Sequence, residues 1–507
     1  MDGRLSYVVF VMEEQKTGTS YGSIFKTTFL FGFVQVFKAI IAIVKNKLVA
    51  ILIGPEGMGL LGIFNSTIQM IQTGAGLGIN QSAVRDVAEA KGSGDHEMVS
   101  RIVKVTNRVV LFTGLLGCLV TLILSHYLSV WTLGGTAYTL SYCVLAVVVT
   151  LNIINEGKQA LLKGVRHLRA LAYASMIGTV VGLVTAIPLY YFFGKDGIVP
   201  ELLIASTLAL LVSQYFVNKI PVEPVALTLK ETFKEAQPMI RMGVAFMFVT
   251  FLQTITSFAV NAFIRSQGGL TDVGYFSAGS NILNAYFGMI ITALMTDYYP
   301  RIAAVNQDNG KIQDELNKQS MVSVVLCCPL IVLFIALMPL FVNILYSQEF
   351  MPTLDYLRFG IFWTVITICS NQVDMILIAK NNSKVFMTIS VIVRAVQLVL
   401  CIVLYKYWGL VGLGISYGLL GVLHMAIMTT VVSKLYDIHF TKEFIKTGGI
   451  VLMFTIVATV IGSVLGGATR YIAAITFVGV ATYYSYIVSR NKLDIDFIQI
   501  LKNKIKR

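Results

Sequence analysis

The sequence predicts an all-α polytopic membrane protein with about fourteen transmembrane helices. Two six-helix lobes related by pseudo-twofold symmetry are expected, followed by two C-terminal helices. Three observations predict this fold: an apolar composition, apolar runs of spanning length and an internal repeat. Of 507 residues, 56% are apolar and 13% are charged, whereas soluble proteins carry about 25% charged residues. So few charges cannot cover a water-exposed surface, and the composition therefore excludes a soluble enzyme.

Apolar runs long enough to cross a bilayer recur along the chain. A spanning helix needs about 20 residues, most of them apolar. Fourteen runs meet this need, at residues 27–53, 58–82, 105–130, 137–161, 170–193, 198–217, 241–264, 271–299, 320–346, 354–379, 385–407, 410–433, 447–467 and 470–489. Before them, residues 5–12 form an apolar run that is too short to span, and no cleavable signal is expected.

Basic residues are distributed unequally over the connections between these runs. The odd-numbered connections hold only Lys195, Arg265, Arg358, Lys406 and Arg470. The even-numbered connections and the tail hold many more, among them Arg85, Lys104, Lys163, Arg169, Lys230, Arg301, Lys318, Lys442, Arg490 and Lys504. Because short cytoplasmic loops are enriched in Lys and Arg, both termini are expected in the cytoplasm. Topology thus accounts for the net charge of +13, and no nucleic-acid partner is expected.

An internal repeat relates the two halves of the chain. Gly57 and Gly62 recur as Gly269 and Gly274 at a shift of 212. Arg85 and Gly94 recur as Arg301 and Gly310 at a shift of 216. Leu189-Tyr190 with Gly194 and Gly197 recurs as Leu404-Tyr405 with Gly409 and Gly412 at a shift of 215. Each repeat holds six runs, an even number, so the two copies share one orientation. Transporters with such repeats have a pseudo-twofold axis along the membrane normal.

The runs and the repeat divide the chain into six parts. These are a cytoplasmic N-terminal segment (1–26), an N-lobe with helices 1–6 (27–217), a cytoplasmic linker (218–240), a C-lobe with helices 7–12 (241–437), two additional helices (438–489) and an amphipathic basic cytoplasmic tail (490–507). The linker is expected to act as a hinge and to contain an interfacial helix, because residues 230–237 are charged and Pro238 precedes the seventh run.

Motifs for catalysis, cofactors and metals are lacking. There is no nucleotide-binding G-x-x-x-x-G-K-[ST] and no H-E-x-x-H zinc motif. The glycines at 74–78 and 412–414 lie in apolar runs, where small residues allow close helix approach. The cysteines are all inside apolar runs, so neither a disulfide framework nor a metal site is expected. His424 is interpreted as a packing or hydrogen-bonding residue.

Charged side chains within the first run are the most unusual feature. Gln35, Lys38 and Lys45 share one helix face, because they are separated by three and seven residues. One Lys at mid-membrane costs about 2.5–3.5 kcal/mol, so such residues usually face a polar cavity or an acidic partner. Two explanations remain open for Lys38 and Lys45: an anionic substrate, or a buried salt bridge to Asp374 or Glu156.

The repeat extends this polar face to three further runs. In the second run Asn65, Gln69 and Gln72 share a face, and a shift of 212 places them on Ser277, Asn281 and Asn284. The same shift places Lys38 and Lys45 on Thr250 and Ser257. Polar stripes are costly in lipid unless they line a common aqueous space. A cavity between the lobes is therefore expected, lined by Gln35, Lys38, Lys45, Asn65, Gln69, Gln72, Gln253, Ser257, Asn261, Asn281 and Asn284.

Such a lining suits an anionic ligand that carries many hydroxyl groups, because Lys binds phosphate and amides bind sugars. Outside these stripes, Glu156, Asp374 and Arg394 are charges that serve either ion coupling or structure. Arg394 has three open roles: a phosphate anchor, the wall of a lipid groove, or a partner of Asp374.

The stretch Lys47–Gly62, with Gly76-Leu-Gly-Ile79 and Val84-Arg-Asp86 downstream, resembles the Wzx-type O-antigen translocases. These belong to the multidrug/oligosaccharidyl-lipid/polysaccharide exporter superfamily. The resemblance covers about residues 20–437 and implies two six-helix lobes around a central cavity. The two trailing helices are similar to those of the fourteen-helix lipid II flippases of the same superfamily. In those flippases a basic residue of the first helix lines the cavity, where Lys45 would lie. Their basic residue early in helix eight has no match at 277–280.

The resemblance implies a flippase in the bacterial cytoplasmic (inner) membrane. It would move an undecaprenyl-pyrophosphate-linked oligosaccharide, an O-antigen or related polysaccharide repeat unit, from the inner to the outer leaflet. Its partners would be this glycan, membrane lipid and the polysaccharide polymerase machinery, and no cofactor is implied. The alternatives are a drug/cation antiporter of the same superfamily, a lipid II-type flippase, a membrane polymerase or ligase, and a channel. Runs 1, 2, 7 and 8 hold no acid well inside, and the outer connections are short, which disfavours an antiporter and an enzyme.

Overall fold

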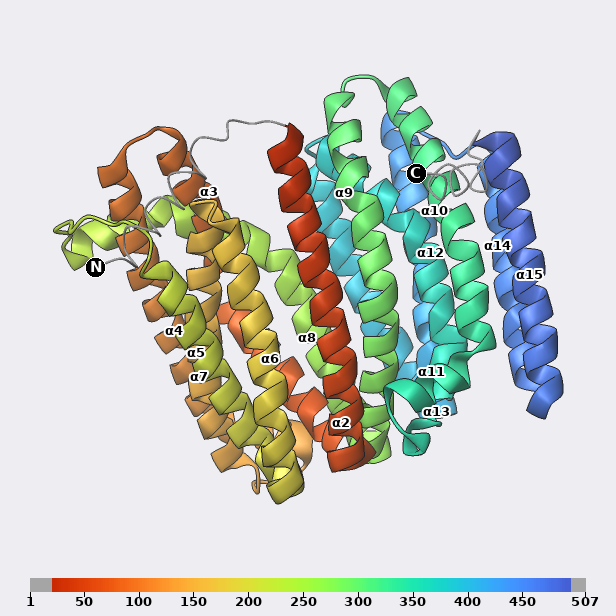
Figure 1. Ribbon diagram of the computed structural model, residues 1–507, viewed down its shortest axis with the longest axis horizontal. Coiled ribbons are helices and arrows are strands. Elements are labelled where there is room, and N and C mark those ends of the chain that lie inside the picture. The colour runs from red at the N-terminus through yellow and green to blue at the C-terminus, as the bar shows by residue number, and fades with distance from the viewer. Residues whose placement is uncertain (1–20, 494–507) are drawn as a thin grey trace. The chain divides into compact units, whose positions relative to one another are not determined.

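The computed structural model describes residues 21–493, and within that range its regular secondary structure is all helix, with no strand (Figure 1). The predicted basic tail lies outside the described residues from 494 onward, and so does most of the predicted N-terminal segment. Each of the fourteen apolar runs coincides with helical structure. Within the described range, nine helices are long and apolar enough to cross a membrane, several of them with a kink or break inside. The all-α polytopic fold is therefore confirmed, and the count of fourteen crossings stays a prediction.

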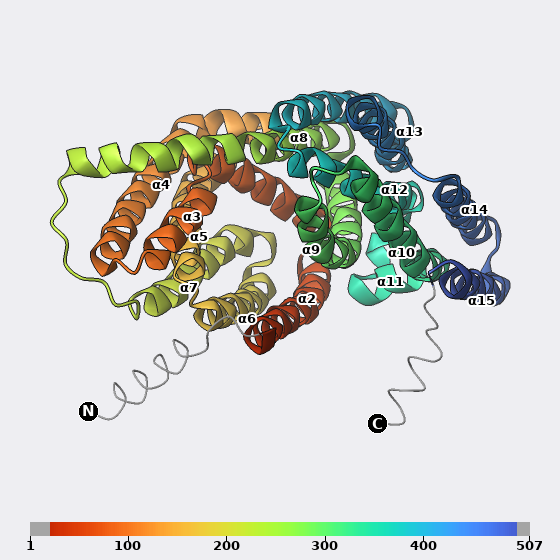
Figure 2. The same ribbon diagram turned by 90° about the horizontal axis from the view of Figure 1, so that it is seen from above.

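The first half of the chain forms six α-helices, of which the first contains two apolar runs. They are α2 (Tyr21–Ala75), α3 (Ile79–Gly92), α4 (His96–Leu133), α5 (Thr139–Gly164), α6 (Leu168–Phe193) and α7 (Ile198–Val217), with the short 3₁₀ turn η1 (Gly194–Gly197) before α7. Side by side in Figure 2, α5, α6 and α7 pack against one another. A non-helical segment, residues 218–228, then leads to α8.

The second half begins with the long helix α8 (Leu229–Ile282). After it come the π-helical turn η2 (Leu283–Phe287), α9 (Gly288–Ala304), α10 (Asn309–Ala336), α11 (Met338–Leu345), η3 (Gln348–Phe350), α12 (Thr353–Ala379), α13 (Ser383–Tyr436), α14 (Lys442–Val464) and α15 (Gly467–Lys492). The last two helices run next to each other, and both pack on α10 (Figure 1). Asp308 caps α10 by accepting the Lys311 backbone N–H at 3.0 Å.

Glycines with positive φ turn the chain where two predicted runs merge into one long helix. They are Gly54 (φ 64°) in α2, Gly269 (φ 78°) in α8 and Gly409 (φ 55°) in α13. Only glycine adopts this backbone region without a steric penalty, so each position fixes a sharp turn. In α2 the next residue is Pro55, which suits the first position of a new helical segment.

The internal repeat is visible in these turns, but at a different register from that predicted. A Cβ at Gly59 would lie 1.8 Å from the Leu270 carbonyl oxygen, and a Cβ at Gly274 would lie 1.9 Å from the Pro55 carbonyl oxygen. This reciprocal contact, the glycine crossing, relates Pro55 to Leu270 and Gly59 to Gly274 at a shift of 215. The predicted shift of 212 was wrong there, because glycines five residues apart occur twice, at 54 and 59 and at 57 and 62.

The same shift of 215 holds at the other end of the repeat. Gly194 and Gly409 both have φ 55°. A Cβ at Gly197 would lie 2.4 Å from the Leu189 carbonyl oxygen, and one at Gly412 would lie 2.0 Å from the Leu404 carbonyl oxygen. One offset therefore relates equivalent turns and equivalent backbone contacts in the two halves.

The chain forms two compact units. Unit 1 contains residues 1–48, 71–128 and 136–248, and unit 2 contains residues 49–70, 129–135 and 249–507. A buried apolar cluster in unit 1 joins α3, α4, α5 and α7 around Val87, Leu161 and Leu162. A cluster in unit 2 joins α9, α10, α12 and α13 around Tyr298, Ile376 and Leu420. The predicted lobe boundaries stay predictions, and the segment 49–70, predicted in the N-lobe, packs within unit 2.

Candidate functional site

Lys45 lies in unit 1 against a carboxylate that the sequence analysis did not select. Its Nζ donates to Glu201 Oε1 at 2.9 Å, and the Tyr190 hydroxyl donates to Glu201 Oε2 at 3.1 Å. Glu201 occupies the first turn of α7 and is 1% exposed, whereas the Lys45 side chain is 30% exposed. Both oxygens of a buried carboxylate are therefore satisfied, one by a cation.

Two explanations were left open for Lys45, an anionic substrate and a buried salt bridge, and this pair bears on them. Of the two, the salt bridge is the one that the structure shows, but the proposed partners Asp374 and Glu156 were wrong, since the partner is Glu201. The sequence does not mark Glu201 as a partner, because it lies three residues inside the sixth run and acids are common at helix starts. The signal that could have found it is the repeated Leu-Tyr motif: Tyr190 donates to Glu201, and its equivalent Tyr405 donates to Asp272 at 2.6 Å.

Lys38, the other lysine on this face, has a different environment. It is half-buried, and in the described part of the chain no carboxylate oxygen lies within 4 Å of its ammonium group. Gln35, three residues earlier, is exposed. Of the predicted cationic stripe, Lys38 thus has no ion pair with any acidic side chain that the structure describes.

Glu156 accepts hydrogen bonds from two amides, both in unit 1. Gln72 Nε2 lies 2.7 Å from Oε1, and Asn80 Nδ2 lies 3.0 Å from Oε2. The chain leaves α2 at Ala75 and re-enters helix at Ile79 through two left-handed residues, Leu77 and Gly78, which returns Asn80 to Glu156. A Cβ at Gly78 would lie 2.2 Å from the Gly243 carbonyl oxygen, so the predicted close-packing role of this glycine is confirmed.

A polar cavity of about 420 Å³ opens beside Glu156, between α3 and α5. Its walls are mostly polar, formed by Asn80, Gln81, Val84, Glu156, Gln159 and Lys163. Amide, carboxylate and ammonium groups together offer both donors and acceptors, which is the requirement for binding hydroxyl groups.

A half-buried cluster of titratable side chains lies in unit 2. His424 Nε2 is 3.5 Å from Asp374 Oδ1, and the imidazole stacks on Trp363 with ring centroids 6.4 Å apart. Arg394 donates to Gln397 Oε1 at 2.7 Å, one turn along its own helix. Of the roles left open for Arg394, a direct ion pair with Asp374 is therefore not formed. His424 packs on Trp363, as its sequence interpretation predicted, and its Nε2 lies near the Asp374 carboxylate without a hydrogen bond to Oδ1.

The other predicted lining residues are distributed over both units. Gln72 lies in unit 1, and unit 2 contains the remainder, Asn65, Gln69, Gln253, Ser257, Asn261, Asn281 and Asn284. Asn65 is half-buried, and Gln69, Gln253, Ser257, Asn281 and Asn284 are exposed. Asn261 is buried, and its Oδ1 has no hydrogen-bond partner among the described residues. In that same part of the chain, no group of three or more His, Cys, Asp or Glu side chains is placed to hold a metal ion.

The profile of a family described as polysaccharide biosynthesis protein matches residues 48–355. The chain belongs to this family. A comparison of the sequence with curated proteins finds no match. The family match agrees with the resemblance inferred from residues 47–86, and the predicted polytopic membrane fold is confirmed.

Solved structures of membrane transporters share the fold. The lipid II flippase MurJ in an inward-closed conformation superposes with a TM-score of 0.70 at 14% identity, over 92% of this chain and 100% of that chain. A multidrug resistance MATE family transporter of the MOP superfamily, inward-facing, gives 0.66 at 15% identity, over 79% and 96%. The outward-facing form of such a transporter gives 0.57 at 16% identity, over 81% and 96%. The chain of this polysaccharide biosynthesis family member is thus a multi-pass membrane protein that shares the fold of these transporters.

Proposed function

We propose that this protein is a flippase for a lipid-linked oligosaccharide. Its substrate would be an undecaprenyl-pyrophosphate-linked repeat unit of O-antigen or a related polysaccharide, moved from the inner to the outer leaflet of the bacterial inner membrane. The observation that carries the proposal is the match to a polysaccharide biosynthesis family over residues 48–355, in a chain that has a flippase fold.

The chemistry of the substrate defines what such a protein must provide. Sugars and pyrophosphate cannot cross hydrocarbon unaided, because each polar group would lose its hydrogen bonds to water. The lipid tail can stay in the bilayer while the headgroup moves. A translocation path therefore needs cations for phosphate and amides or hydroxyls for sugars, and it needs to open alternately to each side.

Lys38 is the residue that we assign to the phosphate. Among the described side chains no carboxylate oxygen lies within 4 Å of its ammonium group, whereas Lys45 is held by Glu201 at 2.9 Å. Amides at Gln35, Asn65, Gln69, Gln253, Asn281 and Asn284, with the hydroxyl of Ser257, would bind the glycan, and the cavity beside Glu156 supplies a further polar surface. Asn261, with an unpaired buried carbonyl, would accept from a sugar hydroxyl.

Alternating access requires a contact that breaks when the protein changes state. The glycine crossing is suited to that role, because it joins segment 49–70 to the start of the eighth run through backbone atoms alone. With both termini in the cytoplasm, this crossing lies at the outer side. We assign it as the outer gate, which would separate as the headgroup leaves. A polysaccharide polymerase would then receive the flipped unit.

A cation-coupled antiporter of the same superfamily is the second candidate. The observation that favours it is the half-buried Asp374–His424 pair, with Arg394 on a neighbouring segment, since paired titratable groups inside a membrane protein often mark proton pathways. Glu156 is a half-buried acid of unit 1. These charges can also serve a flippase as its coupling device, and a lipid II-type substrate would use the same path.

Deletion of the gene tests the proposal and separates the candidates. A flippase for a polysaccharide unit predicts that the undecaprenyl-pyrophosphate-linked glycan accumulates on the inner leaflet, and that a plasmid copy clears it. Lys38→Ala should fail to clear it, Lys38→Arg should clear part of it, and Lys384→Ala, an exposed lysine outside the path, should behave as wild type. Normal glycan export in the deletion strain, with raised drug sensitivity, would favour the antiporter.

A further inference from the structure

Unit 1 contains a second cavity that the proposed translocation path does not use. It has a volume of about 600 Å³, is open on one side and is lined by α4, α5, α7 and the non-helical segment that precedes α8. Apolar side chains such as Leu111, Ile154 and Leu210 form most of its wall. Three basic side chains, Lys104, Arg108 and Lys158, gather in the remainder.

The three cations are held by neutral groups. Lys104 Nζ donates to the Val225 carbonyl, Arg108 Nη1 donates to the Leu227 carbonyl at 2.8 Å, and Lys158 Nζ donates to Asn107 Oδ1 at 2.7 Å. In the part of the chain that the structure describes, none of them has a carboxylate oxygen within 4 Å.

Glu223 is the one acidic residue in the wall, so the three cations exceed it by two charges. Its backbone N–H donates to the Ser100 hydroxyl at 2.9 Å. The cations keep unused donors, because an ammonium group has three N–H bonds and a guanidinium has five. A site with surplus positive charge and spare donors favours an anion.

We propose that this cavity binds an anionic bilayer phospholipid, with its phosphate on Lys104, Arg108 and Lys158. One acyl chain would lie along the apolar wall. A soluble phosphate would leave that wall exposed to water, whereas a lipid covers both parts of the cavity. The cations lie near the ends of α4, α5 and α7 that the charge distribution places at the cytoplasmic leaflet, where basic pockets between helices bind acidic headgroups.

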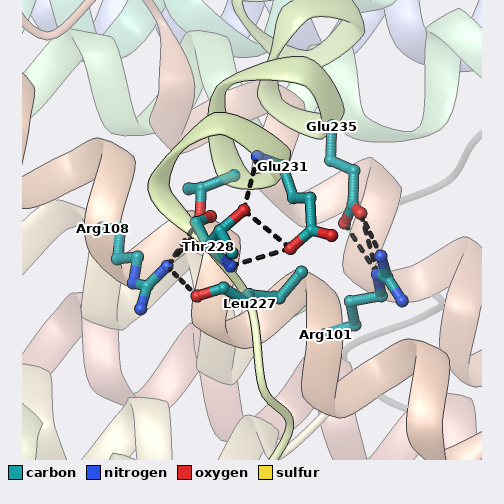
Figure 3. Close-up of polar contacts among 7 residues, drawn as sticks. Arg101, Arg108, Leu227, Thr228, Glu231 and Glu235 are labelled. Carbon is teal, nitrogen blue, oxygen red and sulfur yellow. Dashed lines mark hydrogen bonds and ion pairs between the residues drawn. The ribbon is translucent and has the colours of Figure 1, made fainter.

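The position of the cavity links lipid binding to the segment that leads into α8. Figure 3 shows Arg108 against the Leu227 carbonyl and Arg101 against Glu235, with a shortest distance of 2.6 Å in that pair. Thr228 caps α8, since its hydroxyl oxygen accepts the Glu231 backbone N–H at 3.2 Å, and its own backbone N–H and hydroxyl donate to the Glu231 carboxylate at 2.8 Å. Lys104 and Arg108 thus serve both the segment and the phosphate. A bound lipid would hold residues 222–228 on α4.

Native mass spectrometry and thermal unfolding of the purified full-length chain test this site. Phosphatidylglycerol should bind and raise Tm, whereas phosphatidylcholine should do neither. Lys158→Gln should weaken phosphatidylglycerol binding roughly fivefold, and Lys158→Gln with Lys104→Gln roughly twenty-five-fold, at about 1 kcal/mol per cation. Lys384→Gln, which removes one exposed charge from unit 2, is the matched control and should bind as wild type.

Several outcomes would overturn the assignment. Equal phosphatidylglycerol binding by the wild type and both variants places the lipid elsewhere. Equal effects of the two phospholipids remove the role of the anionic headgroup. Full stabilisation by glycerol phosphate identifies a soluble ligand, and preference for undecaprenyl phosphate over phosphatidylglycerol assigns the cavity to the transported lipid. Because Lys158 contacts only Asn107 among these partners, retained Tm of Lys158→Gln without lipid shows that this variant is folded.

Discussion

Removal of Lys45 should destabilise the protein more than removal of its partner. In Lys45→Ala, the carboxylate of Glu201 stays 1% exposed and keeps only the Tyr190 hydroxyl. Stranding one member of a buried pair costs about 3–5 kcal/mol. In Glu201→Gln, by contrast, the remaining charge is on a lysine that is 30% exposed and long enough to reach a more polar region.

We therefore expect Glu201→Gln to cost about 1–3 kcal/mol, the range for an unsatisfied buried partner. The double variant Lys45→Met with Glu201→Gln carries no buried charge, and it should recover to within about 1 kcal/mol of the wild type. Thermal unfolding in detergent measures these differences. For a chain of this length, a loss of several kcal/mol corresponds to a fall in Tm on the order of 5 °C.

Each variant is assayed for glycan export at the same time. If Lys45 is structural, as the Glu201 pair indicates, export should follow stability and return in the double variant. Wild-type stability of Lys45→Ala together with lost export would refute this reasoning, because Lys45 would then act on the substrate. Equal destabilisation by the two single variants would refute the argument from their unequal burial.

Three further predictions follow from single features of the structure. Gly274→Ala places a methyl group 1.9 Å from the Pro55 carbonyl oxygen and should cost about 1–3 kcal/mol and increase labelling of Ser277→Cys; unchanged labelling would contradict the outer gate. Gly135→Cys and Gly466→Cys, where a Cβ meets no atom within 4 Å, should react with an impermeant thiol reagent in intact cells, and Gly92→Cys only after permeabilisation; the reverse pattern would overturn the orientation. Hydrogen bonds from the Thr228 backbone N–H and hydroxyl lower the pKa of Glu231, so the contribution of Glu231 to stability is present above the usual glutamate range and is lost as pH falls through the lowered pKa. Proteolysis of residues 218–228 should therefore increase on acidification, and less steeply in Glu231→Gln. An identical pH profile in the wild type and the variant would contradict the cap.

The helices were predictable because apolar run length is a direct signal in a membrane protein. Every predicted run from 27–53 to 470–489 coincides with helix, and the sixth, 198–217, coincides with α7 at both ends. The linker was predicted less well. The expected interfacial helix is not separate, since α8 begins at Leu229 and continues through Pro238 into the seventh run. The start of α8 is fixed by contacts from Arg101 to Glu235 and from Arg108 to the Leu227 carbonyl, which the composition does not reveal.

The site was harder to predict than the fold, because it depends on which helix faces meet. The stripe of Gln35, Lys38 and Lys45 followed from spacing along one helix. The partner of Lys45 lies 156 residues away, and no pattern within α2 points to it. Gln72 was assigned to the cavity by periodicity, but it donates to the carboxylate of Glu156. The left-handed turn at Leu77 and Gly78 brings Asn80 to that same carboxylate. The repeat register failed for a related reason, since equal glycine spacings allow two alignments.

The most direct test of the proposed function is flipping by the purified protein. Full-length protein is reconstituted in liposomes with an undecaprenyl-pyrophosphate-linked oligosaccharide, and the glycan that reaches the outer leaflet is measured with an impermeant glycosidase. We expect protein-dependent exposure of the glycan, strongly reduced in Lys38→Ala, partly retained in Lys38→Arg and unchanged in Lys384→Ala. No protein-dependent exposure, or full activity of a stable Lys38→Ala variant, would contradict the assignment of Lys38 to a lipid-linked anionic substrate.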